Sequence, residues 1–134
     1  MCTTNPVSKI KLEGIQLCHV SFADITDSKR FDAFSIEKAV RIRKFIDKLE
    51  DVSELYICCD RGESRSAAIA AAVLRHYGRN EMVVWKNVHY HPNPYVYHLQ
   101  CKAFGLSSSK VRALILSKYN KYLFKKQIQA QRKT

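Results

Sequence analysis

The sequence predicts an α/β domain with a central, mostly parallel sheet flanked by helices. The apolar run 55–58 lies between charged residues and precedes a loop and an alanine-rich helical stretch, as a buried strand does when it passes into a helix. The alternating segment 16–22 precedes an amphipathic helical pattern, and such a helix can cross over between two parallel strands. We therefore expect residues 1–134 to form one domain with one core.

The first predicted strand and helix occupy the N-terminal third of the chain. Residues 16–22 alternate in the manner of a half-buried strand, and a polar turn follows at 23–27. A helix is predicted from Ser35, a residue type that commonly caps helix N-termini, to about Glu50. Its apolar residues recur at spacings of three and four, which predicts one buried face: Ile36, Ala39, Val40, Ile46 and Leu49.

Three further helices are predicted after the loop at 58–66. The first begins near Ser66 and ends by Gly78, because glycine favours the position just past a helix C-terminus. Asn80 can cap a short helix containing residues 82–85. Asn93 followed by Pro94 is typical of a helix start, since proline fits the first helical position.

The C-terminal region, residues 106–134, is predicted to be a basic helix capped by Ser107-Ser108-Ser109. All twelve acidic residues lie before Met82, so the ten Lys and Arg residues that follow are unopposed. This favours contact with a polyanion such as RNA, anionic lipid or an acidic phosphorylated substrate, although a solvated helix face carries similar charges. The apolar stripe of this helix is predicted to pack on the domain: Val111, Leu114, Ile115, Tyr119, Tyr122 and Leu123.

The cysteines, the apolar runs and the histidines limit the class of protein that the sequence can encode. Five cysteines, two of them adjacent and none preceded by a secretory signal, predict free thiols and a cytoplasmic location. No apolar run reaches the about 18–20 residues that span a bilayer, so no transmembrane segment is expected. His89, His91 and His98 lack the spacing of a compact zinc site, and we expect no metal.

The loop at 58–66 carries the residues of a candidate active site. A strand, a tight loop and a helix N-terminus form a nest of backbone N–H groups that holds an oxyanion. At the mouth of such a nest, Cys59 is expected to be a thiolate that can attack phosphorus. Arg65 can bind two phosphate oxygens, and Ser66 can donate its hydroxyl to the sulfur. The expected phosphate-binding loop is Asp60, Arg61, Gly62, Glu63, Ser64 and Arg65.

The pattern Cys59-x5-Arg65-Ser66 with Gly62 resembles the signature loop of the cysteine-dependent protein tyrosine phosphatases, most closely the small dual-specificity group. The resemblance covers about residues 15–105. It implies a phosphotyrosine protein phosphatase-like fold, a phosphocysteine intermediate and no cofactor. The alternative for these residues is a buried structural cysteine and an arginine at the start of a helix.

The resemblance also implies a general acid, because the leaving oxygen of a phosphate ester needs a proton. In the family this acid is an aspartate after a strand upstream of the nucleophile. Asp24 directly follows the strand and is the first choice, with Asp27 as the second; either could instead be a turn or capping residue. Cys58 stands where the family usually has a histidine that orders the loop and tunes the thiolate.

The sequence therefore predicts a hydrolase that acts on phosphate monoesters, first of all phosphotyrosine in proteins and also phosphoserine or phosphothreonine. Two alternatives stay open. The basic C-terminal region favours a phosphatase of RNA 5′ ends or phosphoinositides. The replacement of histidine by Cys58 favours a phosphate-binding module without turnover.

Overall fold

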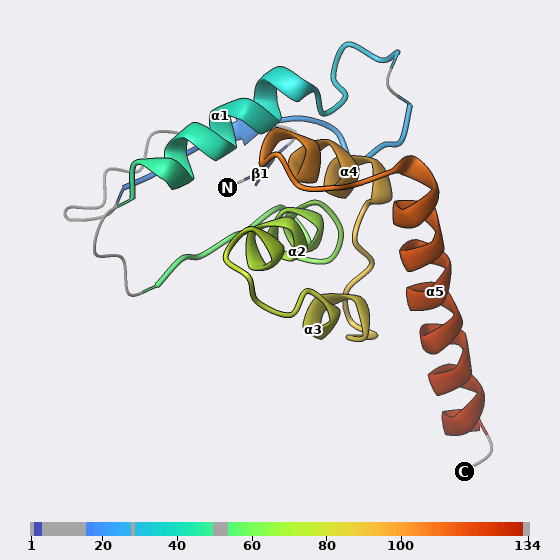
Figure 1. Cartoon of the computed structure of the whole chain (residues 1–134). Coiled ribbons are helices and arrows are strands. Elements are labelled where there is room, and N and C mark those ends of the chain that lie inside the picture. Colours follow the sequence, from blue (N-terminus) through green and yellow to red (C-terminus); the bar gives the residue numbers. More distant parts are fainter. Residues whose placement is uncertain (1, 4–15, 28, 50–53, 133–134) are drawn as a thin grey trace.

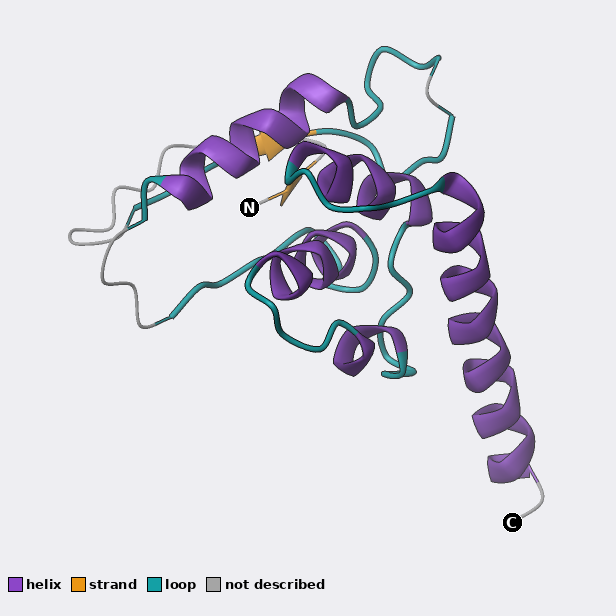
Figure 2. Cartoon of the chain, viewed as in Figure 1, coloured by secondary structure: helices purple, strands orange, loops and turns teal. Residues whose placement is uncertain are grey.

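The computed structural model of the chain describes residues 2–3, 16–27, 29–49 and 54–132. Helices make up 54% of the described part and strands 3%, so the fold is mostly helical (Figure 2). The elements in chain order are β1 (Cys2–Thr3), β2 (Val20–Ser21), α1 (Ile36–Asp47), α2 (Arg65–His76), α3 (Met82–Trp85), α4 (Pro94–Ala103) and α5 (Lys110–Arg132).

The predicted central parallel sheet is wrong. The described strands are only two residues each, and β1 pairs with β2 in parallel, Cys2 with Val20 and Thr3 with Ser21. The run 55–58 is irregular rather than a buried strand, with Leu55 and Tyr56 exposed by 37% and 78%. A run of four apolar residues does not by itself distinguish a strand from other structure, and a strand needs neighbours to be stable. Consequently α1 does not cross over between two strands of one sheet.

Packing of helices around α4 takes the place of the expected sheet. In Figure 1, α4 lies between α1 and α2, and it also packs against α5. The side chains of Val96, Tyr97 and Cys101 on α4 are fully buried. The facing helix α2 is rich in buried alanines, and small side chains allow two helix axes to approach closely. The core is therefore made by helix faces instead of by the two sides of a sheet.

Two predicted helix boundaries, the start of α1 and the end of α2, are confirmed. The Ser35 side chain accepts a hydrogen bond from the Lys38 N–H at 3.3 Å, so it caps α1 as expected. The helix ends at Asp47, and the expected end at Glu50 lies outside the described residues. Gly78 follows α2 with a φ of 70°, a conformation that glycine adopts without strain.

The predicted starts of the later helices are also confirmed. The Asn93 side chain accepts from the backbone N–H groups of Tyr95 and Val96, and Pro94 is the first residue of α4. Asn80 accepts from the N–H of Met82 at the start of α3. For α5, the Ser109 hydroxyl accepts from the N–H of Arg112 at 3.0 Å.

The orientation of α5 differs from the prediction. Its buried residues are Ala113, Ser117 and Asn120, which are small or polar. The apolar residues that were expected to pack inward lie largely on the solvent side, because the helix presents the 113–117–120 face to α3 and α4. Within the described residues, no helix combines the length and the apolar character needed to cross a membrane.

A buried polar cluster attaches α5 to the rest of the domain. Arg112 on α5 donates to the Tyr97 hydroxyl and to a Glu81 carboxylate oxygen, both at 2.7 Å. The Tyr97 hydroxyl donates to the other oxygen of Glu81. Burial and the hydrogen bond to Glu81 raise the pKa of Tyr97, so its hydroxyl stays protonated and remains a donor. The cluster thus joins the segment before α3, the centre of α4 and the first turn of α5.

This cluster predicts the effect of truncating Arg112. The substitution Arg112→Ala leaves the carboxylate of Glu81, whose side chain is about 10% exposed, without its cationic partner. We expect the free energy of unfolding to fall by about 1–3 kcal/mol, less than for a fully buried ion pair because Arg112 is partly exposed. Urea unfolding followed by circular dichroism measures it. The exposed Lys118→Ala on the same helix is the control, and equal midpoints for the two variants would contradict the assignment.

Candidate active site

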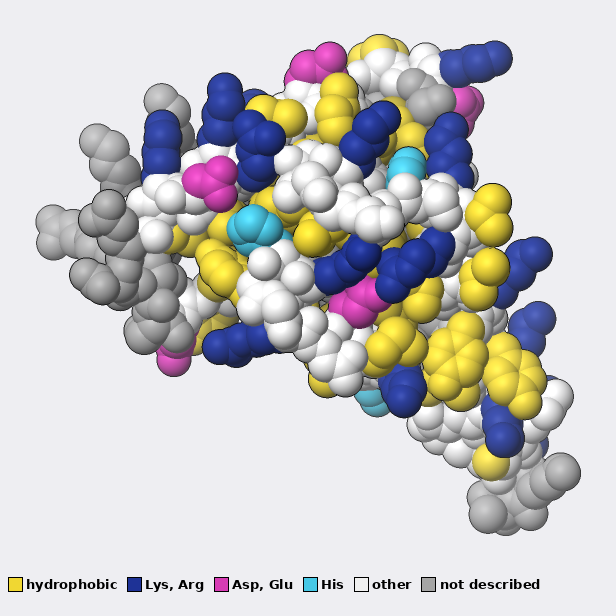
Figure 3. Space-filling view, viewed as in Figure 1, with side chains coloured by type: hydrophobic (Ala, Val, Ile, Leu, Met, Phe, Trp, Pro, Cys, Tyr) yellow, Lys and Arg dark blue, Asp and Glu magenta, His cyan; other side chains and the backbone are white. Residues whose placement is uncertain are grey.

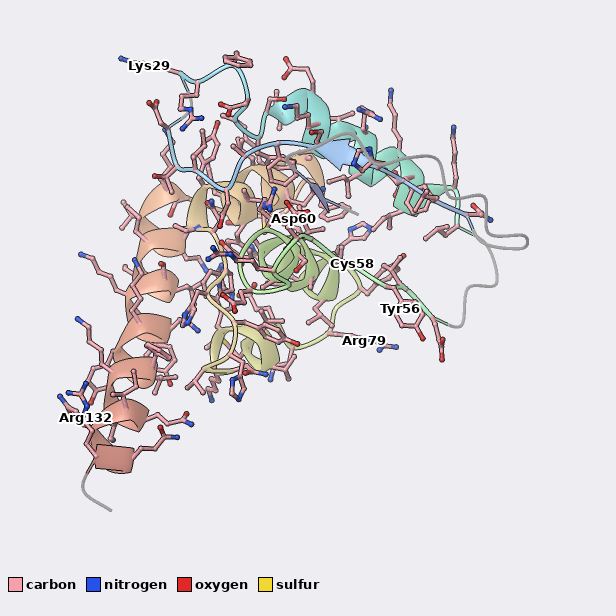
Figure 4. The ribbon with its side chains drawn as sticks, turned by 180° about the vertical axis from the view of Figure 1, so that it is seen from behind. Lys29, Tyr56, Cys58, Asp60, Arg79 and Arg132 are labelled. Carbon is pink, nitrogen blue, oxygen red and sulfur yellow. The ribbon has the colours of Figure 1, made fainter. Side chains whose placement is uncertain are left out.

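Cys59 lies at the start of a tight loop that leads into α2. Figure 4 shows Asp60 beside the N-terminal end of α2, with Cys58 and Tyr56 farther back along the irregular segment. Gly62 turns the loop with a φ of 67°, in the left-handed region that favours glycine. The loop therefore has the tight geometry expected from the sequence, although the segment before it is not a strand.

The Cys59 sulfur is surrounded by hydrogen-bond donors. The N–H groups of Gly62 and Ser66 point at Sγ over 3.2 Å and 3.4 Å. The Ser66 hydroxyl lies 3.1 Å from Sγ and can donate to the ionised sulfur. Burial alone would raise the pKa of Cys59, but these hydrogen bonds outweigh it and lower the pKa below that of an ordinary thiol. Cys59 is therefore set up to be a nucleophile.

The neighbouring segment 91–93 fixes the direction of the loop carbonyls. The N–H of His91 donates to the carbonyl of Glu63 at 2.8 Å, and the N–H of Asn93 donates to that of Ser64 at 3.3 Å. A trans peptide places its C=O and the next N–H on opposite sides. The N–H groups of Ser64 and Arg65 are thus directed away from this segment, as a phosphate-binding loop requires.

The buried Arg65 side chain joins the loop at 58–66 to the segment that follows β2. One terminal nitrogen donates to the carbonyl of Phe22 at 2.9 Å, and the other donates to the carboxylate of Asp60 at 3.1 Å. The Arg65 side chain is 7% exposed and that of Asp60 is 45% exposed. A guanidinium has five N–H donors, so these two contacts leave donors available for an oxyanion. Arg65 is thus oriented before any ligand binds.

Asp24 reaches the loop and Asp27 does not. The Oδ1 atom of Asp24 accepts from the Ser64 hydroxyl at 2.8 Å and from the side-chain amide of Asn93 at 2.9 Å. Asp27 instead accepts from the backbone N–H of Lys29 in a local turn. Of the two candidate acids, Asp24 is therefore the one that contacts the loop at 58–66.

Several residues of this arrangement were missed by sequence reasoning. Asn93 was expected to cap a helix, and its side chain also holds Asp24 and the carbonyl of Ile25. The Nδ1 atom of His91 bonds the Oδ1 atom of Asn120 on α5 at 3.0 Å. A cap residue satisfies its expected role without these contacts, so the sequence carries no signal for them.

The other residues expected in the loop lie at the surface, and His98 makes a local contact. Arg61 and Glu63 are exposed, and Cys58 is exposed beside the nucleophile. His98 bonds the hydroxyl of Ser108. In the described part of the chain, no three His, Cys, Asp or Glu side chains are grouped so that they could hold a metal ion.

Comparison with protein-family models, with curated proteins and with solved structures finds no match.

The donors around Sγ predict the pH dependence of Cys59 reactivity. Because the pKa of Cys59 is lowered, its alkylation by iodoacetamide should persist as the pH falls below the ordinary thiol pKa of about 8.5, and decline only as the pH passes through the lowered value. Cys18, which is partly exposed, is the internal reference, because burial raises its pKa. Mass spectrometry of the labelled peptides measures both rates.

Ser66→Ala should shift the Cys59 alkylation profile toward higher pH, because it removes the hydroxyl that favours the thiolate. Cys58→Ser is the matched control and should leave the Cys59 profile in place. If Cys59 and Cys18 reacted with the same pH profile in the parent protein, the donor nest would not exist in solution.

Proposed function

We propose that the protein hydrolyses phosphate monoesters through a cysteinyl-phosphate intermediate. The observation that carries the proposal is the position of the Cys59 sulfur beneath the N–H groups of Gly62 and Ser66, at the N-terminus of α2. The same donors and helix dipole that favour a thiolate also favour a bound oxyanion. Asp24, held on the loop through Ser64, supplies the acid that ester cleavage needs.

The proposed first step transfers the phosphoryl group to sulfur. The Cys59 thiolate attacks phosphorus, the bond from phosphorus to the ester oxygen breaks, and the leaving oxygen takes the proton from Oδ2 of Asp24. Negative charge on the transferring oxygens is balanced by the loop N–H groups and the guanidinium of Arg65. The alcohol or phenol leaves, and phosphocysteine remains.

The proposed second step returns the enzyme to its starting state. Water attacks the phosphocysteine, and the Asp24 carboxylate accepts a proton from that water. The phosphorus–sulfur bond breaks, and the hydroxyl of Ser66, 3.1 Å from the sulfur, stabilises the departing thiolate. Inorganic phosphate leaves, so each proton and electron pair is accounted for without a cofactor.

Phosphotyrosine in proteins is the proposed first substrate class, with phosphoserine and phosphothreonine as further substrates. The loop lies at the surface, where an extended peptide has access, because Asp60, Arg61 and Glu63 are exposed. A cavity of about 180 Å³ lies beside the Asp24 turn and can receive a side chain next to the phosphorylated residue. It is lined by Thr26, Pro94, Tyr95, His98, Lys110 and Leu114.

A second candidate function is phosphate binding without turnover. It is favoured by the ion pair between Arg65 and Asp60, which already occupies part of the guanidinium, and by Cys58 in place of histidine. Vanadate would then bind to the protein, yet no ester would be cleaved. RNA 5′ ends and phosphoinositides are the alternative substrates, favoured by the ten basic residues after Met82, among which the sequence has no acidic residue.

Hydrolysis of p-nitrophenyl phosphate tests the proposed chemistry. We expect vanadate-sensitive turnover by the parent protein and its loss in Cys59→Ser, because a hydroxyl in this nest is not ionised at neutral pH. Cys58→Ser should retain turnover and serves as the control. Vanadate binding by a parent protein that shows no turnover on this ester, a phosphotyrosine peptide, RNA ends or phosphoinositides would favour the binding module instead.

The role of Asp24 is tested by its amide variant. Asp24→Asn keeps the hydrogen bonds at Oδ1 but has no transferable proton, so kcat for a phosphotyrosine peptide should fall by about 10²–10⁴-fold. The control Asp27→Asn should turn over at the parent rate, because Asp27 accepts its hydrogen bond from Lys29 in its own turn. A full rate for Asp24→Asn combined with a loss for Asp27→Asn would reverse the assignment.

A further inference from the structure

The outward face of α5 is both apolar and basic. Val111, Leu114, Ile115 and Tyr122 are exposed by 66%, 51%, 60% and 58%, and Tyr119 lies beside them. Figure 3 shows hydrophobic side chains alternating with Lys and Arg along this helix. Residues 111, 115, 118 and 122 are three or four apart, so they form one continuous strip along the helix. We call this exposed side of the helix the α5 face; it consists of residues 111, 114, 115, 118, 119, 121, 122, 125 and 126.

The charges on the α5 face have a single sign. Its lysines are interleaved with the apolar side chains, and α5 contains no acidic residue over its 23 positions. A partner that covers the face must therefore offer negative charge and an apolar environment together. The lysines concerned are Lys118, Lys121, Lys125 and Lys126.

The α5 face cannot turn inward, because the opposite side of the helix is fastened to the domain. The side-chain amide of Asn120, which is fully buried, donates to the carbonyls of Trp85 and Tyr90 at 2.8 Å and 2.9 Å. Arg112 bonds both Tyr97 and Glu81. Rotating α5 to bury its apolar side would break all of these contacts.

We propose that the α5 face docks on the surface of an anionic lipid bilayer. Val111 and Ile115 enter the boundary between headgroups and acyl chains, and the tyrosines lie at the level of the headgroups. Lysine side chains extend from such a helix with their stems along the apolar surface and their ammonium groups on lipid phosphates. The helix stays parallel to the membrane and the domain remains outside it.

The alternative occupants fit the face less well. A second copy of the chain would place the lysines of two α5 helices against each other, and like charges repel. A nucleic acid backbone would pair with the lysines but would leave the exposed aliphatic side chains in water, because the phosphates offer no apolar surface. An anionic bilayer offers both an apolar interior for the aliphatic side chains and phosphates for the lysines.

Co-sedimentation with vesicles tests the proposal on the full chain, independently of any phosphatase activity. We compare vesicles of phosphatidylcholine alone with vesicles that contain about 30% phosphatidylserine. We expect binding only to the anionic vesicles, with a loss of about tenfold or more in bound protein as salt rises from about 0.05 M to 0.5 M. No binding to the anionic vesicles at low salt would overturn the proposal.

Two double variants, each with a matched control, separate the apolar and the basic contributions to vesicle binding. Ile115→Ser with Tyr122→Ser, and Lys118→Glu with Lys121→Glu, should each reduce binding to the anionic vesicles by about tenfold or more. The matched controls lie elsewhere on the surface and should bind as the parent protein does. They are Tyr77→Ser with Val83→Ser, and Lys44→Glu with Lys48→Glu.

Each remaining outcome also decides the proposal. Equal losses in the controls would mean that general charge or unfolding causes the effect, which circular dichroism of every variant checks. Loss in the lysine pair with full binding in the Ile115 and Tyr122 pair would exclude insertion of the apolar strip. A gel shift of RNA that depends on the same residues, without vesicle binding, would assign the face to nucleic acid instead.

Discussion

The candidate site depends on one asparagine that joins three parts of the chain. The buried Asn93 caps α4 with its side-chain oxygen, holds Asp24 with its side-chain nitrogen, and donates its backbone N–H to the carbonyl of Ser64. A polar side chain buried with all of these groups satisfied has one conformation, because any rotation leaves a donor or an acceptor unpaired. The relative positions of the Asp24 turn, the nucleophile loop and α4 follow from this constraint.

Much of the helical framework was predictable, because helix ends depend on local chemistry. Ser35 and the pair Asn93-Pro94 start helices in the structure as they do in isolated sequence patterns. The nucleophile loop was also predictable, since Cys59, Gly62 and Ser66 act through a short stretch of backbone. These features depend only on residues that are close in sequence, within one or two helical turns.

The sheet and the orientation of α5 were not predictable, because both depend on partners distant in sequence. The run 55–58 has the composition of a strand, but the strands of the described residues are β1 and β2, of two residues each. In α5, the stripe that begins at Val111 has helical spacing, yet hydrogen bonds from Asn120 to carbonyls around residues 85–90 select the opposite face for burial. Periodicity predicts that one side of a helix is apolar, but it does not predict which element of the fold that side contacts.

The ion pair between Asp60 and Arg65 has a consequence for which anions can enter the loop. An incoming oxyanion competes with this carboxylate for the guanidinium, so its arrival is in part a ligand exchange. The exchange favours a doubly charged oxyanion over a singly charged one, because only the former brings more charge to Arg65 than Asp60 already does. Under the proposed function, the loop would thereby discriminate by charge between a phosphate monoester dianion and a sulfate monoester of the same shape.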